Sequence, residues 1–111
     1  MLKLSGNTIY VTKGDTVDLS INITNKDGEP YEPNPDDSIR FALKKKYTDE
    51  NTLIFKEISV NDLRLRIESQ ETKELSVRDS PYVYDIQLTM PDGTVDTFID
   101  REKMYITEEV D

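Results

Sequence analysis

Apolar and polar residues alternate with a period of two in several separate parts of this chain. The alternation runs through residues 17–24, 39–44, 63–68 and 82–90. Successive side chains of a β-strand point to opposite faces, so a period of two predicts strands with one buried face. The apolar residues of these segments form the predicted core, which includes Ile21, Phe41, Leu65, Ile86 and Leu88.

Turn-forming residues separate the predicted strands. The longest alternation ends at "PDG", residues 91–93. Proline presets the φ of the first central position of a type I turn, and glycine tolerates the positive φ that follows. A hairpin is therefore predicted, with residues 94–99 as its second strand and a further strand over residues 103–110. The stretch "EPYEPNPDD" carries three prolines and predicts a surface loop.

Composition supports an all-β fold. Ala42 is the single alanine, whereas threonine occurs 11 times and tyrosine 6 times. The best helix former is almost absent and strand-forming residues are abundant. We predict an all-β, immunoglobulin-like β-sandwich of about seven to eight short antiparallel strands. Residues 1–111 are expected to form one domain, and a small barrel is the alternative architecture.

Three local features refine this prediction. Residues 52–60 ("TLIFKEISV") are apolar on both faces, which indicates a more central strand. Residues 69–77 ("SQETKELSV") are the one stretch expected to form a helical turn or two. Tyr82 and Tyr84 alternate with Ile86, which favours core positions over a sugar-stacking pair.

The chain contains neither cysteine nor histidine. Those residues supply thiol chemistry, the commonest zinc ligands and the commonest general base. We therefore expect no enzymatic activity, no cofactor, no metal site and no small-molecule substrate. No apolar run approaches the ~18 residues of a membrane span, and "MLKLSGNTIY" lacks the apolar stretch of an export signal. The net charge of −9 disfavours binding to nucleic acid and to anionic lipid.

A calcium site formed by acidic residues is the one alternative to the expected absence of metal. Calcium takes oxygen ligands, and five acidic residues lie in the loop that contains the prolines. They are Asp27, Glu29, Glu32, Asp36 and Asp37. Their spacing does not match the twelve-residue helix–loop–helix calcium motif, so a solvated acidic loop is the expected state.

Basic residues are concentrated in the middle of the sequence. Residues 40–66 contain seven basic and four acidic residues, whereas the remainder contains seven and nineteen. Alternation places Arg40 and Lys44 on the outer face of one strand, and Arg64 and Arg66 on the outer face of another. These four are the candidate partner-binding residues for an acidic partner, and a solvated sheet face is the alternative.

Five stretches occur in a recognisable order: "NTIYVTKGD", "DGEPY", "DDSIRFALKK", "ETK" and "YVYDIQL". Together they resemble small proteins encoded by phages and prophages of Gram-positive gut and lactic bacteria. The N-terminal module of phage baseplate upper proteins is similar, and the resemblance extends from Asn7 to Val110. It implies an immunoglobulin-like sandwich that serves as a structural part of the virion, in tail, baseplate or head fibre. No catalytic residues are implied.

The resemblance also implies partners and a location. The partners would be other virion proteins, including further copies of this chain, and the protein would be found in the virion and in the host cytoplasm during assembly. The chain ends without a receptor-binding or coiled-coil region, which favours an adaptor or decoration protein. Two other classes stay open: a carbohydrate-binding or adhesin-type module of a bacterial surface protein, and a small hydrolase.

The expected absence of a structural metal is testable. Treatment with EDTA should leave the melting temperature unchanged, because no zinc site is expected and the acidic loop does not need calcium to fold. Differential scanning calorimetry with and without added calcium measures this. A clear drop with EDTA that calcium reverses would instead establish a site around Asp36 and Asp37.

Overall fold

The structure is a computed structural model that describes residues 2–5, 7–23, 29 and 31–108, with the backbone alone at residues 2–5, 98 and 100. Its elements are eight strands and one short helix: β1 (Leu2–Ser5), β2 (Thr8–Thr12), β3 (Val17–Ser20), β4 (Ser38–Lys44), β5 (Ile54–Ile58), β6 (Arg64–Ile67), α1 (Ser69–Lys73), β7 (Tyr82–Thr89) and β8 (Val95–Thr107). The predicted all-β class is confirmed.

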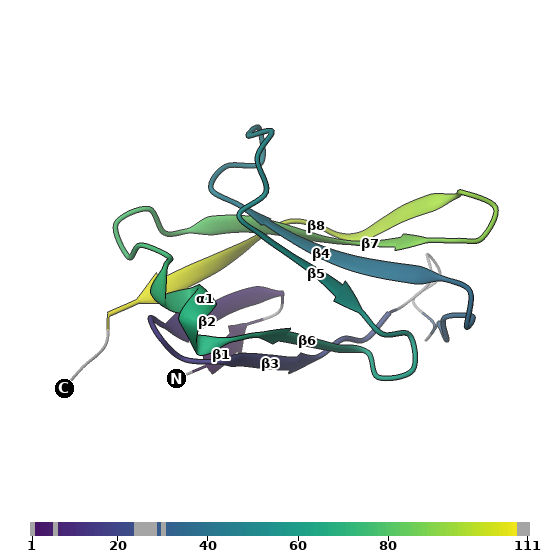
Figure 1. Cartoon of the computed structure of the whole chain (residues 1–111), viewed down its shortest axis with the longest axis horizontal. Helices are drawn as coiled ribbons and strands as arrows, with labels where there is room; N and C mark the ends of the chain where they lie inside the picture. The colour runs from purple at the N-terminus through teal and green to yellow at the C-terminus, as the bar shows by residue number, and fades with distance from the viewer. Residues whose placement is uncertain (1, 6, 24–28, 30, 109–111) are drawn as a thin grey trace.

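The strands form two sheets that pack face to face (Figure 1). Six strands form one sheet in the order β1-β2-β8-β7-β4-β5, and β3 pairs with β6 in the other. Each sheet has an apolar inner face because its strands alternate, as β7 does with a buried residue at every second position. The five predicted core residues are all buried between the sheets, and so are Tyr82 and Tyr84.

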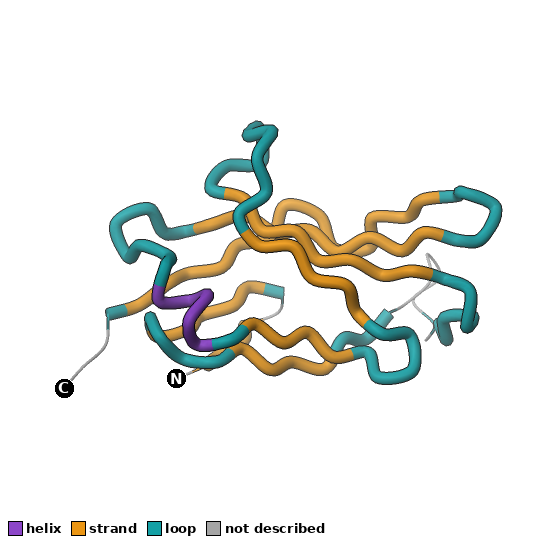
Figure 2. Tube along the Cα trace, in the orientation of Figure 1, coloured by secondary structure: helices purple, strands orange, loops and turns teal. Residues whose placement is uncertain are grey.

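The strand order is that of an immunoglobulin-like sandwich. In such domains strands C, F and G, with C′, form one sheet, while B and E belong to the other. Here β4, β7, β8 and β5 occupy the places of C, F, G and C′, and β3 and β6 those of B and E. The single helix, α1, lies in the connection between β6 and β7, at one end of the sandwich (Figure 2).

A tyrosine at the start of β7 fixes this connection. The hydroxyl of Tyr82 accepts a hydrogen bond from the backbone N–H of Ser76 at 2.8 Å. A tyrosine that begins strand F and bonds back to the backbone is a hallmark of immunoglobulin domains. Two residues later, where antibody domains carry a disulfide cysteine, Tyr84 packs against Phe41 with ring centroids 5.4 Å apart. Aromatic packing therefore occupies this part of a cysteine-free core.

The helix and the hairpin turn occur where the sequence predicts them. α1 begins with a capping box between Glu68 and Glu71, which satisfies backbone N–H groups at its first turn. In the hairpin, the N–H of Gly93 donates to the carbonyl of Met90 at 2.9 Å. Gly93 has φ +91°, a conformation that side chains with a Cβ rarely adopt.

The predicted central position of residues 52–60 is wrong. β5 lies at the edge of the six-stranded sheet and pairs with β4 alone. Ile54 and Ile58 face the core, but Phe55 points to the outer face and is 50% exposed. The apolar residues on both faces therefore reflect one buried face and two exposed residues, Phe55 on the outer face and Leu53 just before the strand.

The prediction of purely antiparallel pairing is also wrong, for one pair. β2 runs parallel to β8, with Ile9 opposite Met104. β2 pairs antiparallel with β1, but the chain then turns at Gly14 and crosses to the other sheet, and it returns to pair with β2 only at β8, so a parallel pair is possible there. The two strands predicted over residues 94–99 and 103–110 belong to one long strand, β8, which ends at Thr107, while residues 109 and 110 lie outside the described part of the chain. The sequence pattern did not predict β1.

Leu88 tests the assignment of faces. It is 3% exposed, and Leu88→Ala should lower the free energy of unfolding by about 2–5 kcal/mol, because the change leaves a cavity in the core. Chemical denaturation measures the loss. The matched control is Thr89→Ala, on the opposite face of β7, which should cost less than ~1 kcal/mol. Equal losses for the two variants would contradict the assignment.

Candidate interaction surface

The outer face of the six-stranded sheet is the candidate interaction surface. Strand register places its outward side chains in rows across the sheet. One row contains Lys44, Val83 and Lys103, and the next contains Phe55 and Ala42 with Asp85 beside them. Because the side chain of Ala42 is small, the surface is lower at this position than at the larger side chains of Phe55 and Asp85 on the neighbouring strands.

A hollow of about 180 Å³ lies on this face. Its walls include Ala42, Val83, Asp85, Tyr47 and Arg101. The guanidinium of Arg101 lies 4.5 Å from the centre of the Tyr47 ring, which is within the range of a cation–π contact. Tyr47 nevertheless remains 55% exposed. An aromatic ring and a cation thus border a mainly polar hollow that is open to solvent.

A β-bulge in β8 directs Arg101 toward this hollow. Between Tyr84 and Ile86 of β7 the partner strand advances from Glu102 to Ile99, so β8 contains an extra residue there. Arg101 lies in this irregular stretch with φ +55°. Bulges often redirect a side chain next to a functional site. The sequence predicted neither Arg101 nor Tyr47 as a surface residue of interest, because a bulge leaves no periodic signal.

The four predicted partner-binding residues do not share a surface. Arg40 and Lys44 lie on the outer face of the six-stranded sheet, where the Nε of Arg40 donates to Oε1 of Gln87 at 3.0 Å. Arg64 and Arg66 lie on β6, on the outer face of the opposite sheet. The prediction of a single basic face is therefore wrong. Strand alternation determines which side chains point inward and which point outward, but it does not determine which sheet a strand joins.

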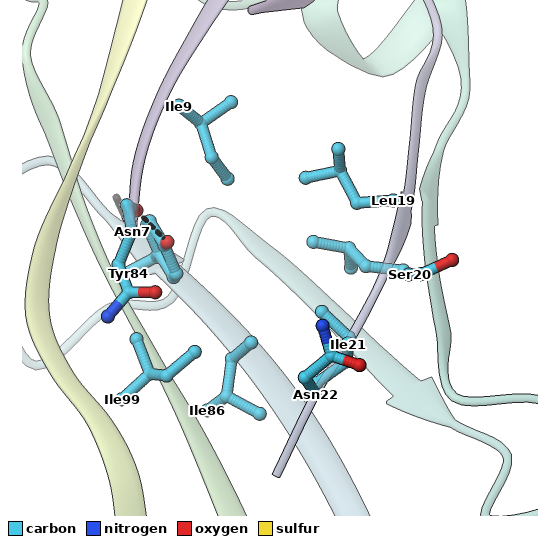
Figure 3. A pocket seen from close by; sticks show the side chains of 10 residues that line it. Asn7, Ile9, Leu19, Ser20, Ile21, Asn22, Tyr84, Ile86 and Ile99 are labelled. Carbon is cyan, nitrogen blue, oxygen red and sulfur yellow. Dashed lines mark hydrogen bonds between the residues drawn. The ribbon is translucent and has the colours of Figure 1, made fainter. Parts of the chain in front are cut away.

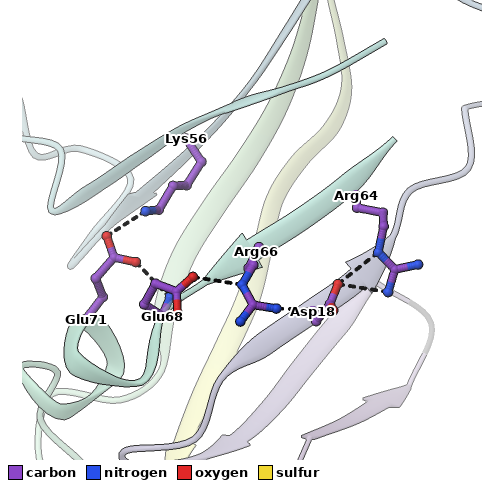
Figure 4. A network of polar contacts seen from close by, with 6 residues as sticks. All are labelled: Asp18, Lys56, Arg64, Arg66, Glu68 and Glu71. Carbon is purple, nitrogen blue, oxygen red and sulfur yellow. Dashed lines mark hydrogen bonds and ion pairs between the residues drawn. The ribbon is translucent and has the colours of Figure 1, made fainter. Parts of the chain in front are cut away.

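Arg64 and Arg66 belong to a ladder of ion pairs (Figure 4). The Nη2 of Arg64 lies 2.9 Å from Oδ1 of Asp18, and the Nη1 of Arg66 lies 3.5 Å from Oδ2 of the same carboxylate. The Nε of Arg66 also contacts Glu68 at 2.7 Å. The hydrogen bond from Arg66 to Glu68, and then the charge of Glu68, raise the pKa of Arg66. Carboxylates of the same chain thus already neutralise these two arginines.

The ladder ends in a contact between the sheets. The Nζ of Lys56 on β5 lies 2.6 Å from Oε1 of Glu71 on α1. Burial raises the pKa of Glu71, but hydrogen bonds from Lys56 and from the backbone N–H of Glu68, with the charge of Lys56, lower it further than burial raises it. This ion pair joins the edge of the large sheet to the helix beside the small one.

A second cavity, of about 170 Å³, lies between the sheets (Figure 3). Leu19 of β3 and Ile21, just after this strand, face Ile9 and Ile99 across it. The hydroxyl of Tyr84 donates a hydrogen bond to the backbone carbonyl of Asn7. Burial, and then the negative charge of Glu102, raise the pKa of Tyr84 to about 12.

The acidic loop does not assemble a metal site in the described residues. Asp37 is only 6% exposed, and its Oδ2 accepts hydrogen bonds from the hydroxyl of Tyr31 at 3.1 Å and from the N–H of Asn34 at 2.8 Å. Burial, followed by the hydrogen bond and charge of Asp37, raises the pKa of Tyr31. No group of three or more acidic side chains in the described part of the chain is placed to hold a metal ion, and Asp27 lies outside that part.

Comparison with known proteins assigns the chain to no family. No family profile matches the chain, and no curated protein is significantly similar to it. Among solved structures it is similar to the first immunoglobulin-like domain of the human CD48 antigen, with 11% identity over 100% of this chain and 93% of that one and a TM-score of 0.47. The immunoglobulin-like architecture therefore rests on the strand order and on Tyr82. In the described residues no helix has the length and apolar character to cross a bilayer.

Tyr84 predicts a pH dependence. Its folded-state pKa of about 12 lies above the ordinary value of 10.0, so the neutral form is favoured in the folded protein. Its contribution to stability is complete below pH 10 and is lost as the pH rises from 10 to 12. Tyr84→Phe should remove this part of the alkaline fall in the free energy of unfolding. Denaturation of both proteins at several pH values above neutral tests this, and parallel curves would contradict it.

Proposed function

We propose that this protein is a non-enzymatic structural component of a phage virion that works by protein–protein assembly. An immunoglobulin-like sandwich generally suits a protein-interaction role. The virion assignment is supported by the ordered stretches from "NTIYVTKGD" to "YVYDIQL". Its location would be the virion, and the host cytoplasm during assembly.

One observation supports docking through the outer face of the six-stranded sheet. Tyr47 and Phe55 are both at least half exposed and border the small residue Ala42. Aromatic residues and arginine are enriched where protein interfaces bury a core, and an exposed apolar group rimmed by charge often marks such a site. Arg40, Lys44, Arg101 and Lys103 supply the basic side chains of this rim.

The ion-pair ladder supports the same choice. A charge already paired within the chain must lose its partner or keep it buried when it docks, so it adds little net attraction. Arg64 and Arg66 are paired in this way, whereas none of the ion pairs among the described residues involves Arg40 or Lys44. Of the four predicted residues, we therefore propose that Arg40 and Lys44 contact the partner.

Incorporation into particles tests this function. Mass spectrometry of purified virions should detect the chain, and Phe55→Asp should reduce its incorporation at least tenfold, because a charge replaces the exposed aromatic contact. The matched control is Arg64→Gln with Arg66→Gln on the opposite sheet, which should be incorporated as the wild type is. Absence from purified particles, with binding to a glycan array, would favour the carbohydrate-binding or adhesin-type alternative.

A further inference from the structure

At one end of the sandwich, the charged residues in the described parts of three loops are all acidic. Strand pairing places Ser38 beside Thr89 and Ile39 beside Ile58, so the loops that precede β4, follow β5 and join β7 to β8 gather at the same end (Figure 1). The described parts of these loops contain Glu32, Asp36, Asp62 and Asp92, and Asp96 lies at the start of β8. Within residues 29, 31–39, 58–63 and 88–97 there is no lysine or arginine. We call this the acidic loop end.

The acidic loop end also presents an exposed apolar side chain. Val95 is the first residue of β8, lies opposite Thr89 on the outer face of the six-stranded sheet and is 55% exposed. Asp92 stabilises that turn, because its Oδ1 accepts a hydrogen bond from the N–H of Thr94 at 2.9 Å, and this hydrogen bond lowers the pKa of Asp92. The hairpin is therefore a defined projection with an apolar residue flanked by carboxylates.

The outer face of the six-stranded sheet has the complementary pattern. Basic side chains of Arg40, Lys44, Arg101 and Lys103 lie on it, against the carboxylates of Glu57 and Asp85. No ion pair among the described residues involves Arg40, Lys44 or Lys103. The hollow between them is lined mainly by polar and charged side chains, and the exposed aromatic rings of Tyr47 and Phe55 lie at it and beside Ala42.

We propose that the partner of this face is a second copy of the same chain, which docks its acidic loop end, with Val95 at the hollow, onto the face of the first. This inference rests on the proposed assembly function and names its partner. The two surfaces are different, so the contact is heterologous and repeats from copy to copy as a ring or an open filament.

The free energies of the two kinds of interaction show that docking needs both the ion pairs and the apolar contact. Exposed ion pairs contribute only about 0–1 kcal/mol each, so charge alone would not hold two copies that each carry −9. Val95 and the aromatic rings add apolar area at the centre, which water leaves on docking. At about 0.1 M salt the Debye length is ~10 Å, so repulsion between whole molecules is screened while pairs in contact still attract.

Complementary charge reversal tests the proposal on the full chain. One variant, Lys44→Glu with Lys103→Glu, reverses the sheet face, and the other, Asp36→Lys with Asp96→Lys, reverses the loop end. Each alone brings like charges together and should self-associate at least tenfold more weakly than the wild type. An equimolar mixture should recover association, since each reversed surface meets its complement. Sedimentation velocity at about 0.1 M salt measures this.

The matched control is Lys73→Glu with Arg78→Glu, which changes the net charge as the face variant does but lies away from both surfaces. It should associate as the wild type does. Undiminished association of either reversed variant, or no recovery in the mixture, would overturn the second copy as partner. So would a wild-type chain that stays monomeric at about 1 mM. If particles still exclude Phe55→Asp in that case, the assembly function stands with a different virion protein on this face.

Discussion

Apolar packing between the two sheets, with Phe41 and Tyr84 in contact on the inner face of the larger one, is the constraint on which the rest of the molecule depends. A cysteine-free chain cannot join its sheets through a disulfide, so apolar contact must hold them together. Phe41 and Leu43 from β4 meet Tyr84 and Ile86 from β7, while Leu65 and Ile67 close the core from β6. Tyr82 ties the start of β7 to the loop after α1, which holds the smaller sheet in place over the larger one.

The core divides the charged residues into two groups with different roles. Side chains that point away from it on β6 meet acidic neighbours from β3 and the start of α1, so Arg64 and Arg66 serve the fold. Side chains that point away from it on β4 lie near Gln87, Glu57 and Asp85, but none of the ion pairs among the described residues involves Arg40 or Lys44, so these two keep their charge available. The same residue type at the same alternating position thus has a structural role on one sheet and supports a docking role on the other.

Much of the fold could be predicted because a strand period is local. The buried faces of β4, β6 and β7, the helical turn at α1 and the turn at Gly93 all follow from neighbouring residues. The candidate surface could be predicted only in part. Its cations Arg40 and Lys44 came from alternation, but Tyr47 and Arg101 meet across about fifty residues of sequence through a loop and a β-bulge, which no local pattern reveals.

The sequence by itself determined the all-β class, the inward side of each long strand and the excess of acid, because these depend on the order and composition of residues alone. Tertiary structure decided which sheet each strand joined, placed β5 at an edge, set β2 parallel to β8 and put the two pairs of arginine and lysine on opposite faces. The physical reason is that partner choice between strands is made by contacts between residues far apart in the chain. Each of these strands could bury its apolar face while paired with any of several different strands.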